Sequence, residues 1–174
     1  MKKKSSVKKT KKQKKALPAQ TGNKKIVMVS GGFDPVHIGH VRMFNEAKKL
    51  GDELVVLVNN DNWLNFKKGY AFMPEQERKE IIESVGSVDR VVITEHSKNT
   101  KDISICEELR KIKPHIFANG GDRKPDGDPV PEVSVCEELG IEMVYNIGHG
   151  GKVRSSSDLV KQVQKNKINK KKNK

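Results

Sequence analysis

Two histidines three positions apart are the first feature of this chain that suggests chemistry. His37 and His40 lie in residues 30–40, SGGFDPVHIGH, where an apolar run gives way to a helical pattern. At a helix start this spacing lets both imidazoles point to one side, and a helix N-terminus already attracts anions. Glycines around the pair let the backbone approach a ligand closely. The segment therefore predicts a polyphosphate site, with candidate residues Gly31, Gly32, Phe33, Asp34, His37, Gly39 and His40.

A second polar cluster is the loop 119–123, NGGDR. Gly121 permits a close approach of the backbone, and Asp122 can accept hydrogen bonds from a ribose or a base. An ordinary turn uses the same residue types, so both interpretations stay open.

Three consecutive serines, Ser155, Ser156 and Ser157, precede the last expected helix. One serine is enough to cap a helix, and this is the simplest interpretation of the segment. Because three hydroxyls exceed that need, we expect them to close over phosphates at a second helix N-terminus. Lys152 and Arg154 stand just before the serines and can add positive charge there.

Apolar runs and helical patterns alternate along the chain, and they must position these clusters. Strands are predicted at 25–30, 54–58, 88–94, 115–119 and 141–147. Helices are predicted at 38–50, from Pro74, around 103–112, near 132–139 and from Ser155. This order predicts an α/β fold with a parallel sheet of about five strands and helices on both faces. Ligands bind such sheets at the carboxyl ends of the strands, where the polar clusters fall.

The net charge of +13 comes from the two ends of the chain. Nine lysines and no acid occur in residues 1–15, and seven lysines and no acid in residues 161–174. Such segments bury too little apolar surface to offset the entropy of ordering. We expect disordered tails at 1–23 and 163–174 around one domain at 24–162. The tails are interpreted as solubilising extensions, with nonspecific contact to a polyanion as the alternative.

Apolar runs are too short for a membrane span, and no apolar segment follows the first lysines as in a secretory signal. Cys106 and Cys136 lie 30 residues apart in amphipathic segments, which favours free thiols in a reducing compartment. The sequence therefore predicts a cytoplasmic protein.

Residues 26–160 resemble the cytidylyltransferase-like nucleotidyltransferases. The resemblance rests on the His-x-Gly-His motif at 37–40, Pro-Glu-x-Glu-Arg at 74–78, Gly-Gly-Asp at 120–122 and a serine-rich element at 155–160. It implies a Rossmann-like fold and catalysis by both histidines with a lysine, either Lys67 or Lys68. It also implies that Arg78 contacts phosphate or helps to organise the site. Relatives that use CTP carry an arginine where this chain has Gly150, and that departure leaves the nucleotide open.

The function implied by the resemblance is transfer of AMP or CMP from ATP or CTP to a sugar phosphate or phospho-alcohol, with release of pyrophosphate. Mg²⁺ would accompany the triphosphate, and a homodimer is a candidate assembly. The competing hypothesis is an inactive nucleotide-binding module whose basic tail binds nucleic acid. A zinc site at His37 and His40 is a weaker alternative, because no cysteine or third histidine lies nearby in the sequence.

Overall fold

A computed structural model describes residues 24–120, 131–148 and 155–160. Its elements, in chain order, are β1 (Ile26–Gly31), α1 (Ile38–Ala47), η1 (Lys48–Leu50), β2 (Glu53–Val58), α2 (Asp61–Lys68), α3 (Glu75–Glu83), β3 (Arg90–Ile93), α4 (Cys106–Ile112), β4 (Ile116–Gly120), α5 (Pro131–Leu139) and β5 (Glu142–Ile147). A short helical segment at 156–160 follows. The segments for which the sequence predicts disordered tails, 1–23 and 163–174, lie outside the described residues.

The five strands form one parallel sheet in the order β3-β2-β1-β4-β5. β1 pairs with β2 along its whole length, from Ile26 opposite Glu53 to Gly31 opposite Val58. On its other side β1 pairs with β4. The chain therefore adds β2 and β3 on one side of β1, and then crosses back to add β4 and β5 on the other side. This architecture confirms the predicted Rossmann-like α/β sheet.

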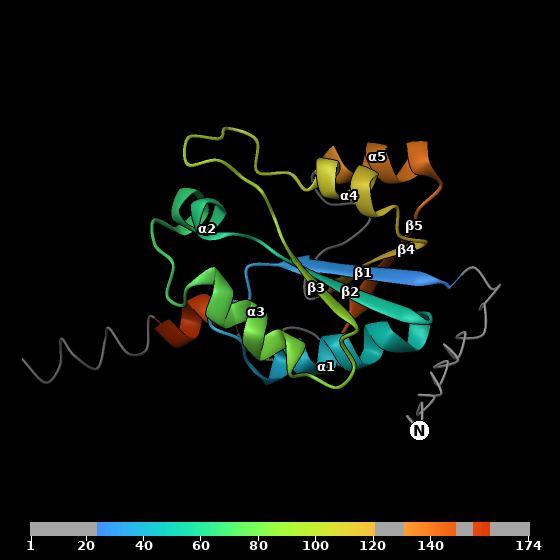
Figure 1. Cartoon of the computed structure of the whole chain (residues 1–174), viewed down its shortest axis with the longest axis horizontal. Coiled ribbons are helices and arrows are strands. Elements are labelled where there is room, and N and C mark those ends of the chain that lie inside the picture. Colours follow the sequence, from blue (N-terminus) through green and yellow to red (C-terminus); the bar gives the residue numbers. More distant parts are fainter. Residues whose placement is uncertain (1–23, 121–130, 149–154, 161–174) are drawn as a thin grey trace, which may run out of the picture.

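Helices cover both faces of the sheet, with α1 and α3 on one face and α4 and α5 on the other (Figure 1). Side chains alternate along β2, so Leu54 and Val56 join the α1 and α3 core while Val55 and Leu57 join the other core. Complete burial of one such side chain stabilises the fold by about 1.5–3 kcal/mol. Burial of both faces explains the continuous apolar pattern of the strands.

The helix α2 was not predicted from the sequence, which indicated only a polar segment after β2. Asn60 caps it by accepting a 2.9 Å hydrogen bond from the Trp63 amide, and Gly69 ends it in the left-handed conformation, with φ of 80°. Only Leu64 is buried in its eight residues. One buried position leaves no apolar periodicity to detect, although the Asn and Gly caps were visible in the sequence.

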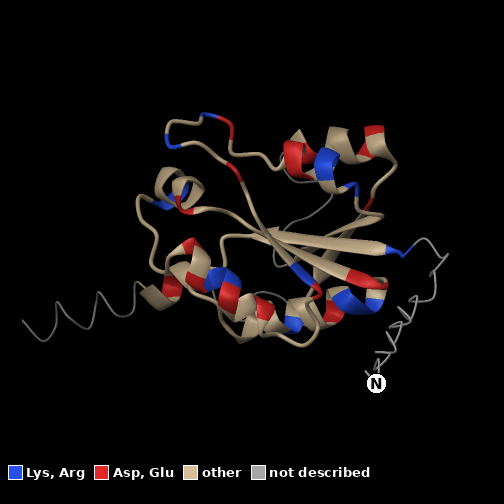
Figure 2. Cartoon of the chain, in the orientation of Figure 1, with Lys and Arg blue, Asp and Glu red and all other residues tan. Residues whose placement is uncertain are grey.

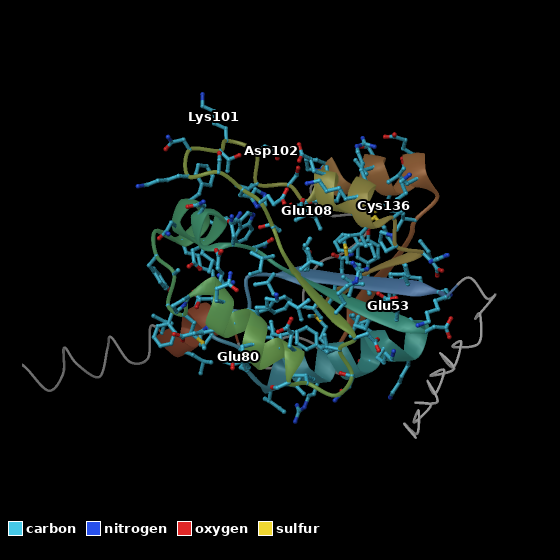
Figure 3. The ribbon with its side chains drawn as sticks, in the orientation of Figure 1. Glu53, Glu80, Lys101, Asp102, Glu108 and Cys136 are labelled. Atoms are coloured by element: carbon cyan, nitrogen blue, oxygen red, sulfur yellow. The ribbon has the colours of Figure 1, made fainter. Side chains whose placement is uncertain are left out.

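Both cysteines are free, as expected. Cys136 lies in α5, in the layer that α4 and α5 form above the sheet (Figure 3). Burial raises the pKa of its thiol to about 11, so the thiol is protonated at neutral pH.

The middle of the sheet carries no charge, and Lys, Arg, Asp and Glu lie on the helices, loops and strand ends (Figure 2). Within the described ranges, no helix has the length and apolar character needed to cross a bilayer.

Candidate active site

The crossover from β3 to β4 places a switch point in strand order between β1 and β4. Loops that leave neighbouring strands in opposite directions open a crevice at such a point, and ligands of open α/β sheets bind there. The loop after β1 leads directly into α1, which begins at Ile38. The fold therefore puts the two histidines at the edge of the sheet where a ligand is expected.

His37 is the N-cap residue of α1, and His40 is its third helical residue. The Nδ1 atom of His37 accepts a 3.1 Å hydrogen bond from the Gly39 amide. The Nδ1 atom of His40 accepts a 3.2 Å hydrogen bond from the His37 amide. The two rings are stacked, with centroids 3.7 Å apart and an interplanar angle of 21°. A capping box made of two histidines thus fixes both rings at the start of α1.

Gly39 lies between the histidines because a side chain would not fit there. A Cβ atom at this position would lie 2.9 Å from Cε1 and 3.0 Å from Nδ1 of the His37 ring. Any larger residue would therefore push the ring away or distort the helix start. The glycine of the His-x-Gly-His motif has a local steric role.

His40 lies in an environment that opposes its protonation. Its ring packs against the Phe33 ring in a T-shaped arrangement, with centroids 5.0 Å apart. Burial, followed by the neighbouring His37 and Lys68, lowers the pKa of His40 to about 3. His40 is therefore neutral in the free protein throughout the physiological pH range.

The two candidate lysines at the end of α2 have different surroundings. Lys67 is exposed, whereas Lys68 is half-buried. Burial lowers the pKa of Lys68, Asp34 opposes this shift, and Arg78 adds to it. Lys68 also acts electrostatically on His40. Of the two lysines, Lys68 is thus the one that is half-buried and acts electrostatically on His40, whereas Lys67 is exposed.

Phe33 and Asp34 shape the loop after β1. Phe33 is buried and adopts φ of 49°, a left-handed conformation that costs a non-glycine residue about 1–2 kcal/mol. The Asp34 carboxylate is buried and accepts hydrogen bonds of 2.8 and 2.7 Å from the amides of Phe72 and Met73. Both residues, predicted to bind nucleotide, therefore hold the loop and the segment before α3 in place.

Gly31 and Gly32 leave room for neighbouring side chains. A Cβ at Gly31 would lie 3.0 Å from the Phe33 ring, and one at Gly32 would lie 2.8 Å from the Leu64 side chain. Small residues at the end of β1 are thus needed for packing.

Arg78 was expected to contact phosphate, but its side chain is completely buried. Its guanidinium donates to the carbonyls of Gly32 and Asn59, each at 2.7 Å, and to that of Met73 at 3.0 Å. Its Nη2 atom lies 2.6 Å from the Asp61 carboxylate. All three nitrogens are bonded to protein groups, so Arg78 joins the ends of β1 and β2 to α2 and α3. This geometry fits the organising role and does not provide the direct phosphate contact.

The three serines have separate surroundings. Ser155 caps the segment 156–160 by accepting a 3.1 Å hydrogen bond from the Asp158 amide. Ser156 is buried and donates a 3.0 Å hydrogen bond to the Pro35 carbonyl. Ser157 is half-buried. The bond to Pro35 brings this helix start beside the loop that precedes the histidine pair. Gly121, Asp122, Lys152 and Arg154, also predicted for the site, lie outside the described residues.

Sequence reasoning missed the polar network that supports α2. The Asn60 amide donates to Thr94 Oγ1 at 3.0 Å, and the Asn60 side chain donates to the His96 carbonyl at 2.8 Å. The His96 ring lies 2.8 Å from the same Thr94 hydroxyl. The polar residues directly after β2 and β3 were the feature of the sequence that could have indicated this network. Their pairing depends on the neighbouring positions of the two strands in the sheet.

The described residues contain no group of three or more His, Cys, Asp or Glu side chains that could hold a metal ion. The histidine pair offers nitrogen atoms, whereas Mg²⁺ prefers oxygen and retains water. The histidine pair by itself therefore does not provide the oxygen ligands that Mg²⁺ prefers.

Residues 28–145 match the sequence model of the cytidylyltransferase-like family. The FAD synthase of Pyrococcus abyssi (strain GE5 / Orsay) is 39% identical over 125 residues, which cover 71% of this chain and 81% of that protein. The bifunctional protein HldE of Cronobacter sakazakii (strain ATCC BAA-894) is 34% identical over 152 residues, which cover 86% of this chain. The matched region is only 30% of that longer relative.

Among solved structures, the chain resembles a lipopolysaccharide core biosynthesis protein from Thermoplasma volcanium GSS1. The TM-score is 0.58 at 26% sequence identity, over 73% of this chain and 99% of that one. The similarity therefore extends over the whole of that solved chain.

Proposed function

Because this chain belongs to the cytidylyltransferase-like family, we propose that it is a nucleotidyltransferase that moves AMP or CMP from ATP or CTP to a small phosphorylated metabolite and releases pyrophosphate. The observation that carries the proposal is the stacked His37 and His40 pair at the start of α1, on which Lys68 acts electrostatically. All three groups lie at the sheet edge where α/β folds bind nucleotides.

The reaction is an in-line attack by a phosphate oxygen of the acceptor on the α-phosphorus of the triphosphate. The bond from the α-phosphorus to the bridging oxygen breaks, and pyrophosphate leaves with its electron pair. No protein nucleophile takes part, so catalysis depends on positioning and on stabilising charge. His40 and His37 donate hydrogen bonds to the oxygens of the transition state, and Lys68 neutralises negative charge on the phosphates.

The remaining predicted groups assist in this scheme. Ser157, with Lys152 and Arg154, contacts the departing pyrophosphate, whereas Ser156 holds the helix start against the loop by donating its hydroxyl proton to the Pro35 carbonyl. Gly121 and Asp122 contact the nucleoside. Mg²⁺ bound to the triphosphate oxygens would offset the negative charge of the substrate. Arg78 acts indirectly, because it holds the loops that carry the histidines and Lys68.

The acceptor is a sugar phosphate or a phospho-alcohol, with flavin mononucleotide as a further candidate. The flavin candidate is supported by the FAD synthase relatives and by two exposed aromatic residues. Phe66, in α2, and Phe72, whose amide donates to Asp34, are each 57% exposed. Exposed aromatic rings near a phosphate site suit a planar acceptor.

The first test is Mg²⁺-dependent release of pyrophosphate by the full chain. ATP and CTP are supplied separately, each with sugar phosphates, glycerol 3-phosphate or flavin mononucleotide. Release with one pairing identifies the nucleotide and the acceptor together. His40→Ala should lower that turnover by about 10²–10³-fold, the loss typical of one transition-state donor.

Equal turnover in His40→Ala and wild type would remove His40 from the mechanism. No release from any pairing, by protein shown to be folded, would contradict the proposed acceptors. A nucleotide-binding titration would then distinguish an inactive nucleotide-binding module, which binds ATP or CTP, from a protein that binds neither.

A further inference from the structure

The two histidines of the pair present the same ring nitrogen to the protein backbone. Nδ1 of His37 accepts from the Gly39 amide at 3.1 Å, and Nδ1 of His40 accepts from the His37 amide at 3.2 Å. Backbone amides have a fixed proton and can only donate. Both Nδ1 atoms must therefore carry a lone pair rather than a proton.

This requirement determines the protonation state of each ring. A neutral imidazole has one N–H and one acceptor nitrogen, and its tautomer is set by the bond that the other nitrogen makes. With Nδ1 accepting, the single proton is on Nε2. Protonation to imidazolium would add a proton at Nδ1, which would face an amide proton and break the cap of α1.

We infer that His37 and His40 are locked by reciprocal backbone caps as uncharged Nε2–H tautomers, and that they serve the reaction as neutral hydrogen-bond donors rather than as cations or proton carriers. The catalytic part of this inference rests on the proposed nucleotidyl transfer. The tautomer itself is a property of the free protein and is tested separately.

The groups around His40 support a neutral state of its ring. His40 packs against the Phe33 ring after β1 and against the His37 ring, and the Lys68 ammonium acts on it from α2. Asp34 is the acid that acts on Lys68, and its carboxylate accepts from the Phe72 and Met73 amides. Arg78 adds positive charge from α3. A second cation at His40 would therefore face positive charge and an apolar ring.

The histidines and the lysine therefore have different roles in the site. The rings supply directed N–H groups that need no change of protonation during turnover. The positive charge that opposes the phosphates comes from Lys68 and from other cationic side chains. Acid would affect the site by breaking the cap of α1, since each added proton replaces an N–H···N bond with two opposed N–H groups.

The test is long-range ¹H–¹⁵N correlation NMR on the full chain with ¹⁵N-labelled histidine, without ligand, from pH 8 to pH 5. His37 and His40 should show a protonated Nε2 and an unprotonated Nδ1 throughout. His115 provides a reference signal for a ring whose Nδ1 accepts from a backbone amide, because its Nδ1 accepts from the Ile26 amide at 3.0 Å. Free histidine in the same buffers should titrate with its ordinary pKa of about 6.5.

His40→Asn assigns the signals, because the Asn Oδ1 atom can replace Nδ1 as acceptor for the His37 amide. In this variant the remaining His37 ring should keep the Nε2–H tautomer. An Nδ1–H tautomer, or an imidazolium at any pH from 8 to 5, at either position of the wild-type protein would overturn the inference. Locked tautomers in a protein that releases no pyrophosphate would leave the inference standing and reject the proposed function.

Discussion

Nη2 of Arg78, in α3, lies 2.6 Å from Oδ1 of Asp61, the first residue of α2. The arginine side chain is fully buried, and 34% of the aspartate side chain is exposed. The same guanidinium reaches the carbonyls at the ends of β1 and β2. One buried cation thus fixes the relative positions of the loop with the histidines and the helix with Lys68.

Arg78→Lys should destabilise the protein by about 3 kcal/mol. The Arg78 guanidinium bonds to four groups, and a lysine ammonium in its place would leave some of these buried polar atoms without a hydrogen-bond partner. Urea unfolding at pH 7.5 measures the change. Arg90→Lys is the matched control, since Arg90 pairs with Glu53 and its side chain is 45% exposed. We expect the control to change stability by less than about 0.5 kcal/mol. Equal effects of the two substitutions would show that the hydrogen bonds of Arg78 contribute little to the stability of the protein.

Lys68→Ala should lower turnover by about 10²-fold or more, as expected when a group that stabilises transition-state charge is lost. Lys67→Ala is the control, because Lys67 belongs to the same helix end but is exposed. Its turnover should stay close to that of wild type. Steady-state pyrophosphate release measures both variants. A larger loss in Lys67→Ala than in Lys68→Ala would assign the catalytic role to Lys67.

Gly39→Ala should lower turnover by about 10²-fold, because the added Cβ displaces the His37 ring from its stacked position. The steric cost is about 1–3 kcal/mol. The higher helix propensity of Ala offsets up to about 1 kcal/mol of it, so turnover is the more sensitive measurement. Gly86→Ala is the control, since a Cβ there meets nothing within 4 Å. Wild-type turnover in Gly39→Ala would contradict a steric role for this glycine.

His40 should make the stability of the protein depend on pH. Its pKa is lowered to about 3 in the folded protein, while the unfolded chain takes up a proton near the ordinary value of 6.5. Between about pH 3 and pH 6.5, His40 therefore takes up a proton when the protein unfolds. Its contribution to the free energy of unfolding is fully present above pH 6.5 and declines as the pH falls below that value. The loss is at most about 1.4 kcal/mol per pH unit for one proton.

Urea unfolding at pH 7.5 and at pH 5.0 measures this decline. His40→Asn cannot titrate, so it should lose less stability than wild type between the two pH values. If the decline is equal in both proteins, the folded protein does not suppress protonation of His40.

Local sequence patterns were sufficient for the strands and for the histidine site. Continuous apolar runs predicted strands buried on both faces, because each strand of this sheet contacts a core above and a core below. His37, Gly39 and His40 interact within one helical turn. Interactions over so few residues are encoded by spacing alone, so the motif could be found without the fold.

The sequence by itself determined the alternation of strands and helices, the polyphosphate-type motif and the concentration of lysines at the chain ends. Only the tertiary structure decided that Lys68 rather than Lys67 acts on His40, and that the Arg78 guanidinium bonds to Gly32, Asn59, Met73 and Asp61. The choice between the lysines depends on the rotation of α2, which a helix with one buried apolar residue does not reveal. The Arg78 bonds join groups up to 46 residues apart, and they form only because β1 and β2 end side by side.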